Sequence, residues 1–165
     1  ERRPALEALR RASSRFDYAI CAAGAADGQV ATLNVGRDLD GATIGASGGE
    51  SRPVPIRTVD SLVSEKRFEG PFLLKFDTHG FELPILEGAR DTLARTQVVV
   101  MEVYNFPITD CSLRFHEMCA RMETLGFACY DLCDPMLRAR DAAFWQMDLF
   151  FCRRDNPLFS YAQYE

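Results

Sequence analysis

An apolar run followed at once by ionisable side chains and a glycine is the part of this sequence best suited to chemistry. Residues 71–76 are Pro-Phe-Leu-Leu-Lys-Phe, and the residues that follow include Asp77, Thr78, His79, Gly80 and Glu82. Such a run is typical of a buried parallel strand, and the polar residues are typical of the loop at its carboxyl end. Because ligands in open α/β sheets bind beyond those strand ends, we expect the functional site here.

Asp77 and His79 are the candidate catalytic residues of this loop. A carboxylate at a strand tip would face the crevice, and an imidazole two residues later could take a proton near neutral pH. Glu82 is a candidate for binding substrate, or else it is a first-turn residue favoured by the dipole of the next helix. These residue types suit a reaction that needs a general base.

A second candidate group follows the next predicted strand, residues 96–104. That run is rich in β-branched residues and ends in Glu102, Tyr104 and Asn105. These three side chains, together with Trp145 from a later strand, are candidates for the pocket that binds the substrate. Aromatic side chains near sheet ends also serve core and rim packing, so this alternative stays open for Tyr104 and Trp145.

The two strand ends together offer oxygen atoms that could ligate a metal. Asp77, Glu102 and Asn105 would suit magnesium or calcium rather than a soft metal. Two carboxylates are a weak basis for a divalent metal site. We therefore expect a hydrogen-bonded polar cluster without a bound metal.

Alternating helices and strands must position these groups, and the hydrophobic pattern predicts a single domain over residues 1–165. Asp27-Gly28 is typical of a hairpin turn, and Thr58 or Asp60 is expected to cap a helix. Residues 36–53 form the longest predicted loop, which is either a lid or a slack connection. The predicted helices are 4–14, a short one opening at 58–63, 82 to about 94, and 113–125. The predicted strands are 18–22, 29–35, 54–58, 71–76, 96–104, 127–132 and 145–152.

The order of these elements predicts an α/β fold. Two consecutive strand–helix units with fully apolar strands imply a parallel sheet with helices on both faces. The last two predicted strands, 127–132 and 145–152, could form an antiparallel hairpin at the sheet edge. We therefore expect a mostly parallel sheet with an antiparallel C-terminal hairpin.

Composition excludes several classes of partner. The chain has 165 residues, of which 47% are apolar and 26% charged, and its net charge of -5 argues against binding nucleic acid or anionic lipid. No apolar segment approaches the roughly 20 residues that span a bilayer, and residues 1–6 lack the apolar part of a signal peptide, so we expect a cytoplasmic protein. The six cysteines contain no C-x-x-C pair and are expected to be reduced and mostly buried.

Residues 74–89 also carry a resemblance to a known family. Leu-Lys-Phe-Asp-Thr-His-Gly-Phe-Glu at residues 74–82, followed by Leu-Glu-Gly-Ala at 86–89, resembles the central motif of the FkbM-type methyltransferases. In that family Leu-Lys-x-Asp-x-x-Gly-x-Glu precedes a Leu-x-Gly-Ala helix. Residues 22–28, 58–62 and 100–103 are similar to the family's alanine-containing loop, its Thr-x-Asp-x-Leu helix start and its Val-x-Glu strand.

The resemblance implies a Rossmann-like class I fold that uses S-adenosylmethionine to methylate a hydroxyl oxygen on a small molecule or carbohydrate. It implies a cofactor site at Asp77 and Thr78, with Ala22 and Ala23 beside the adenine ring because small residues admit a flat base. Helix–sheet packing is the alternative for the two alanines. Methyl transfer to oxygen needs an in-line approach and a hydroxyl that loses its proton, which are roles for Asp77 and His79.

The sequence departs from the family pattern at one point. Methyltransferases of this class begin with a strand and a Gly-x-x-x-Gly loop, followed by a second strand ending in an acidic residue, and neither precedes Pro4. The resemblance therefore implies that N-terminal strands are missing, and we expect residues 1–165 alone to be inactive and to associate through an exposed sheet edge. The alternative is a non-catalytic α/β module that binds a protein partner through that open edge.

Overall fold

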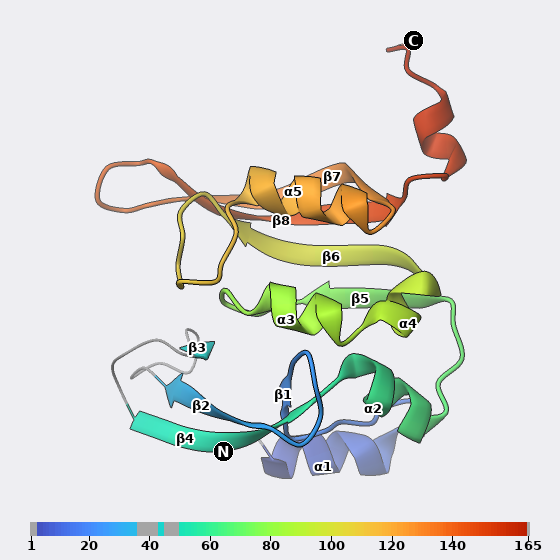
Figure 1. The fold of residues 1–165 in the computed structure, drawn as a ribbon, viewed down its shortest axis with the longest axis vertical. Helices are drawn as coiled ribbons and strands as arrows, with labels where there is room; N and C mark the ends of the chain where they lie inside the picture. The colour runs from blue at the N-terminus through green and yellow to red at the C-terminus, as the bar shows by residue number, and fades with distance from the viewer. Residues whose placement is uncertain (1–2, 36–42, 45–49, 165) are drawn as a thin grey trace.

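The structure is a computed structural model that describes residues 3–35, 43–44 and 50–164. Two four-stranded sheets and their helices make up an α/β fold (Figure 1). We call the sheet of β1 to β4 the N-terminal sheet and that of β5 to β8 the C-terminal sheet. Along the chain the elements are α1 (Arg3–Ala12), β1 (Ala22–Ala23), β2 (Val30–Val35), β3 (Thr43–Ile44), β4 (Glu50–Arg57), α2 (Val59–Lys66), β5 (Phe72–Phe76), α3 (Glu82–Glu87), α4 (Arg90–Ala94), β6 (Thr96–Tyr104), α5 (Phe115–Thr124), β7 (Phe127–Leu137), β8 (Phe144–Arg153) and η2 (Pro157–Ser160).

The C-terminal sheet has the strand order β5-β6-β8-β7. β5 and β6 are parallel, as predicted, because helices α3 and α4 carry the chain back between them. β8 lies between β6 and β7 and is antiparallel to both, so the predicted hairpin at the sheet edge is confirmed. No described strand pairs with the outer edge of β5, and the Leu73 side chain of this strand is 64% exposed.

The N-terminal sheet has the strand order β1-β4-β2-β3, and only its β1–β4 pair is parallel. The prediction of a mostly parallel sheet is wrong for the described strands, because only two of their six strand pairings are parallel. The described part of the connection from β2 to β4 is a strand, β3, and not a helix. β4 pairs with β2 in the antiparallel direction.

The helices α3, α4 and α5 lie on one face of the C-terminal sheet (Figure 1), so the expectation of helices on both faces is wrong for the described chain. β6 is apolar on both faces because its neighbours shield it: Val100 on the open face lies between Lys75 and Phe150 in the register and is 8% exposed. The core on the helical face consists of Phe76, Ile85, Leu86, Ala89, Leu93, Val99, Met101, Val103, Met118, Met122, Phe127, Leu149 and Phe151.

The Asp27-Gly28 turn does not form the predicted hairpin, because β1 pairs with β4 and not with β2. The Asp27 carboxylate instead accepts hydrogen bonds from the backbone N–H of Thr58 at 2.9 Å and from the side chains of Arg57 and Ser61. These bonds hold the turn against the start of α2. Thr58 is the N-cap of that helix, as one of the two predicted alternatives had it, and its hydroxyl accepts from the Ser61 N–H at 3.1 Å.

The predicted helix from 82 to about 94 is divided into α3 and α4 at Gly88 and Ala89. The Gly88 carbonyl accepts a hydrogen bond from the Asp60 N–H at 3.0 Å, and a Cβ atom on Gly88 would lie 2.0 Å from the carbonyl oxygen of Gly24. The Asp60 carboxylate binds the N–H groups of Asp91 and Thr92 at 3.0 and 2.8 Å. We call these contacts the junction, because they join α2 and the loop after β1 to α3 and α4.

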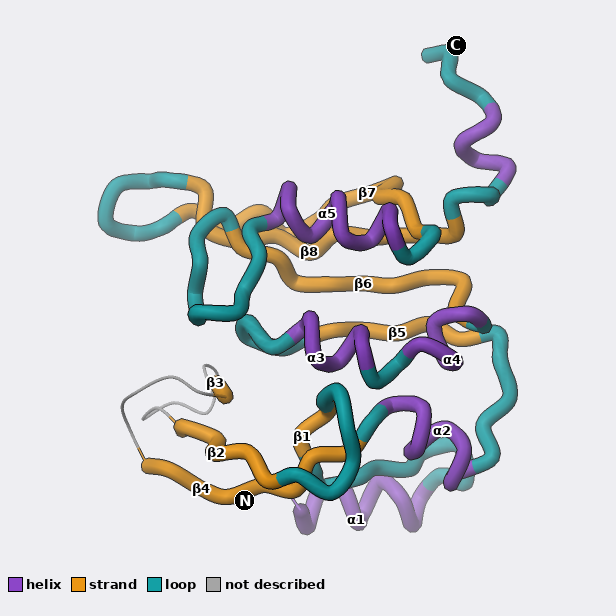
Figure 2. The backbone as a smooth tube through the Cα atoms, in the orientation of Figure 1, coloured by secondary structure: helices purple, strands orange, loops and turns teal. Residues whose placement is uncertain are grey.

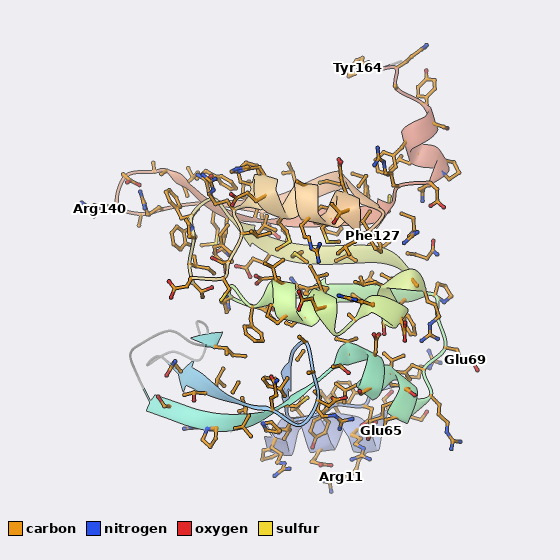
Figure 3. The ribbon with its side chains drawn as sticks, in the orientation of Figure 1. Arg11, Glu65, Glu69, Phe127, Arg140 and Tyr164 are labelled. Atoms are coloured by element: carbon orange, nitrogen blue, oxygen red, sulfur yellow. The ribbon has the colours of Figure 1, made fainter. Side chains whose placement is uncertain are left out.

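Three other expectations concern the rest of the chain. Most of the predicted loop at residues 36–53 lies outside the described residues, and its described parts are β3 and the start of β4. The cysteines are unpaired, but only Cys152 is buried, so the expectation of mostly buried thiols is wrong. Among the described helices, none has the length and apolar character to cross a membrane. Figure 3 shows Arg140 at the tip of the β7–β8 hairpin and Tyr164 on the C-terminal segment, away from both sheets.

Candidate functional site

The loops that follow β5 and β6 lie at the same end of the C-terminal sheet (Figure 2). This placement follows from the parallel pairing of the two strands, which aligns Phe76 with Met101 and directs both carboxyl ends to one edge. The predicted site residues after β5 and those after β6 are therefore brought together.

The loop after β5 is held by the buried carboxylate of Glu82, which is 5% exposed. Its Oε1 accepts hydrogen bonds from the Gly80 N–H at 2.9 Å and from the Thr78 hydroxyl at 3.0 Å. Gly80 has φ of +85°, and a Cβ there would lie 2.7 Å from the Thr109 side chain, so this position requires glycine. Glu82 thus has a structural task, and its predicted contact with substrate stays a prediction.

A cavity of about 200 Å³ lies between this loop and β1. The predicted cofactor-binding residues Ala22 and Ala23 line it, together with Asp77, Thr78 and His79 from the loop. Residues from both sheets thus face one hollow. No sequence pattern predicted the apolar part of the wall, which is made by Cys21, Leu33, Ile44, Phe81 and Ile85.

Asp77 lies at the rim of the cavity and its side chain is 69% exposed. The Nζ atom of Lys75 is 3.9 Å from its Oδ1 and 3.3 Å from Oδ2 of Asp148. Burial alone would lower the pKa of Lys75, but the hydrogen bond to Asp148 and the nearby carboxylates outweigh it and raise that pKa. The Asp77 carboxylate therefore has one cationic neighbour and remains open to a ligand.

His79 is tied to the end of β6 by a chain of hydrogen bonds. Its Nδ1 lies 2.7 Å from the hydroxyl of Tyr104, and that hydroxyl donates to Oε1 of Glu102 at 2.7 Å. The Gln146 amide on β8 donates to the same carboxylate oxygen. Burial, and then the hydrogen bond to Glu102, raise the pKa of the Tyr104 phenol above its ordinary value.

Trp145 and Asn105 lie beside this chain of hydrogen bonds. The Trp145 ring meets the Tyr104 ring edge to face, with centroids 5.9 Å apart, and stacks on Phe106 at 5.6 Å. The Asn105 amide donates to the Phe144 carbonyl at 3.2 Å. Both side chains are half-buried. These packing contacts do not test whether Trp145 and Asn105 bind substrate, which stays a prediction.

The Glu102 and Asn105 side chains considered for a metal contact protein groups, Glu102 through one oxygen atom and Asn105 through its amide nitrogen. Glu102 accepts from Tyr104 and Gln146, and the Asn105 amide binds the β8 backbone. A different set of potential ligands, Cys133, Asp134 and Asp148, comes within 4.8 Å on the β7–β8 hairpin, but exposed acidic groups of this kind are common without a metal. The geometry adds nothing in favour of a metal at the strand ends.

Comparison with known protein families gives one finding. The model of the methyltransferase FkbM domain matches residues 11–129, which is well over half of the chain. The matched range contains every residue that lines the cavity, and Trp145 lies beyond it. Neither the curated proteins nor the solved structures give a match.

Proposed function

This chain belongs to the FkbM methyltransferase family, and we propose that it contributes the site for S-adenosylmethionine-dependent methylation of a hydroxyl oxygen. The acceptor in this proposal is a small molecule or a sugar. The observation that supports it best is the cavity that brings Ala22 and Ala23 together with Asp77, Thr78 and His79. A carboxylate and an imidazole lie at the mouth of an apolar cavity. This arrangement suits a reaction in which a proton is removed from a hydroxyl group while an uncharged part of a bound molecule fills the cavity.

The residues present fit part of the cofactor. The two alanines and the apolar wall suit a flat base, and the exposed Asp77 carboxylate suits a hydroxyl or a cationic group. The volume of about 200 Å³ is below the roughly 300 to 1,000 Å³ of pockets that enclose a ligand of this size. The residues therefore fit one moiety of the cofactor, which when bound would supply an activated methyl group.

The chain's own contribution to the chemistry is to place the acceptor and move its proton. In the proposal, Nε2 of His79 would take the proton that the acceptor hydroxyl loses when the cofactor's methyl group passes from its sulfur to the acceptor oxygen. Asp77 orients the bound groups at the rim, and the apolar wall excludes water from the reacting atoms. Glu82 keeps the backbone between Thr78 and Gly80 in one conformation, which holds His79 in place.

We also propose that residues 1–165 need further chain, or a partner, for full activity. The outer edge of β5 has no described strand partner, and the cavity beside it is smaller than the cofactor's usual pocket. The same free edge supports the second candidate function, a non-catalytic module that binds a protein strand by edge pairing. Self-association through this edge is the corresponding expectation for the isolated chain.

The test is a calorimetric titration of S-adenosylmethionine into the full-length protein that contains this chain. We expect binding, and we expect Asp77→Asn to weaken it by about 10- to 100-fold, the loss typical of a hydrogen bond to a charged group. Methyl transfer to a panel of sugars and small hydroxyl compounds should fall by about 100-fold or more in His79→Ala. The exposed His116 provides the matched control, because His116→Ala should leave both binding and transfer unchanged.

The outcomes separate the two candidate functions. Absence of heat at millimolar cofactor in a folded full-length protein would overturn the methyltransferase proposal and favour the binding module. Unchanged transfer in Asp77→Asn would remove Asp77 from the site. Equal losses in His79→Ala and His116→Ala would remove His79 as the base.

A further inference from the structure

We propose that Tyr104 and Glu102 are positioning residues that fix the tautomer of His79, so that its Nε2 carries the lone pair and acts as the base. The role of His79 as a base comes from the proposed function, on which this inference rests in that respect. The tautomer of His79 is argued from hydrogen bonds alone. The evidence is the chain of hydrogen bonds from Glu102 through Tyr104 to His79, in which each contact is 2.7 Å.

Counting the hydrogens assigns a direction to each bond. An ionised carboxylate only accepts hydrogen bonds, and a phenol has one hydrogen to donate. The hydroxyl of Tyr104 lies 2.7 Å from Oε1 of Glu102, so its hydrogen is used there. The phenol oxygen can then only accept from His79, which requires the hydrogen of the imidazole to be on Nδ1.

The opposite direction is unfavourable for a physical reason. If Tyr104 donated to Nδ1 of His79, its oxygen would face the Glu102 carboxylate at 2.7 Å with no hydrogen between two acceptors. Such a contact is costly, because two acceptor oxygens would repel each other at this distance with no hydrogen bond between them. Burial and the Glu102 bond also raise the pKa of Tyr104, so its hydrogen remains in place.

The surrounding side chains hold the relay in position. The Gln146 amide on β8 donates to Oε1 of Glu102 and keeps that carboxylate turned toward Tyr104. The Trp145 ring meets the Tyr104 ring at 79°, which restricts rotation of the phenol. Tyr104 itself is 6% exposed and His79 is half-buried at the wall of the cavity. A neutral histidine with Nδ1–H bound in this way leaves its Nε2 free to accept a proton.

The test uses nitrogen NMR of the full-length protein labelled with ¹⁵N in histidine. Residues 1–165 hold two histidines, His79 and His116; the spectrum of His79→Ala identifies the His79 signals, and the exposed His116 serves as the internal reference. We expect His79 to show Nδ1–H and an unprotonated Nε2 at a pH where it is neutral. Tyr104→Phe should shift His79 toward the Nε2–H form, while the matched control Tyr130→Phe, at an exposed tyrosine, should leave it unchanged.

A second variant guards against the failure of Tyr104→Phe to fold. In Glu102→Gln the new amide can donate to the phenol, which frees Tyr104 to donate to Nδ1, so we expect the tautomer of His79 to reverse. An Nε2–H form in the unsubstituted protein would overturn the inference, as would an unshifted His79 in a folded variant. In the methyl-transfer assay, kcat of Tyr104→Phe should fall about 10- to 100-fold with little change in KM.

The result for the His79 tautomer and the result for the proposed function can be told apart. The tautomer is measured without cofactor or acceptor, so a protein that binds no S-adenosylmethionine could still show the Nδ1–H form. A protein that transfers methyl groups with an Nε2–H histidine would contradict the roles assigned to Tyr104, Glu102 and Nε2 of His79, but not the methyltransferase activity itself.

Discussion

The two sheets of this molecule differ in how much core they bury. All of the largest fully buried side chains, nine in the described residues, lie between Leu86 and Phe151. In the described chain before β5, the buried apolar side chains are those of Ala31, Ile56 and Val63, and α1 buries none. The C-terminal sheet therefore has the packing of a stable core, and the N-terminal sheet depends on its attachment to it.

The two sheets also contribute different kinds of side chain to the cavity. The C-terminal sheet contributes the ionisable groups, Asp77 and His79, on a loop that Glu82 and Thr109 hold by hydrogen bonds. The N-terminal sheet contributes small and apolar side chains, such as Ala22 and Leu33. Under the proposed function, the groups that move protons need fixed positions, whereas an apolar wall tolerates adjustment, so the better-packed sheet is the suitable place for His79.

The difference between the two sheets is tested most strongly at Gly88, where the end of α3 contacts the loop after β1. In Gly88→Ala the added Cβ would lie 2.0 Å from the Gly24 carbonyl oxygen, so α3 and the loop after β1 must separate. We expect the free energy of unfolding in urea to fall by about 3 kcal/mol. Hydrogen exchange should accelerate more in β1 and β4 than in β6.

Gly28 supplies the control for this prediction. Gly28 has φ of +81°, and a Cβ atom added there would have no neighbouring atom within 4 Å, so Gly28→Ala adds backbone strain without a collision. We expect a cost of about 1 kcal/mol there. Equal losses in the free energy of unfolding for Gly88→Ala and Gly28→Ala would contradict the view that the close backbone contact at the junction makes Gly88 necessary for stability.

The second test removes a polar contact from the same junction. Asp60→Ala deletes the carboxylate that binds the N–H groups of Asp91 and Thr92 and the Thr92 hydroxyl. We expect a loss of about 2 kcal/mol in the free energy of unfolding, because three charge-assisted bonds to α4 disappear. Asp91→Ala, at an exposed side chain of α4, should change stability by less than about 0.5 kcal/mol. A smaller loss for Asp60→Ala than for Asp91→Ala would show that α2 and α4 are held by other contacts.

The smallest effect is expected within the C-terminal part, at the start of α5. The Arg114 guanidinium and backbone N–H bind Glu117 and lower its pKa from 4.5 to about 2. Because the folded pKa is the lower one, the stabilisation is complete above pH 4.5 and is lost as the pH falls toward 2.

Urea unfolding at several pH values checks this expectation. The stability difference between the unsubstituted protein and Glu117→Gln should be constant near neutral pH and shrink below pH 4.5. Glu123→Gln on the exposed side of the same helix should show no such change. A pH-independent difference would mean that the ion pair does not act through the ionised carboxylate.

The sequence predicted the C-terminal sheet better than the N-terminal one, for a physical reason. β5, β6 and α5 carry continuous or periodic apolar patterns that follow from burial in one core, and the parallel pairing of β5 with β6 and the hairpin of β7 and β8 were predicted correctly. The N-terminal sheet has little buried surface, so its pattern is weak. Its turn at Asp27 is determined by distant partners, Arg57 and Thr58, which no local pattern reveals.

The location of the candidate site was predictable only in part. The position of Asp77 and His79 followed from the strand end, and that of Ala22 and Ala23 from the resemblance, and the cavity contains all four. The link from His79 to Tyr104 joins residues 25 positions apart and depends on the register of two strands. Ile44 lies in a segment without periodicity, so its place in the wall could not be foreseen.

The contact between Thr109 and Gly80 has a consequence for protein engineering. The Thr109 hydroxyl donates to the Gly80 carbonyl at 2.9 Å, and its side chain occupies the space beside that glycine. Replacing residues 105–113 with a loop of different sequence would therefore also displace the segment that carries Asp77 and His79. Exchanges in this part of the molecule should retain threonine at position 109, with variation placed at its exposed neighbours Pro107 and Asp110.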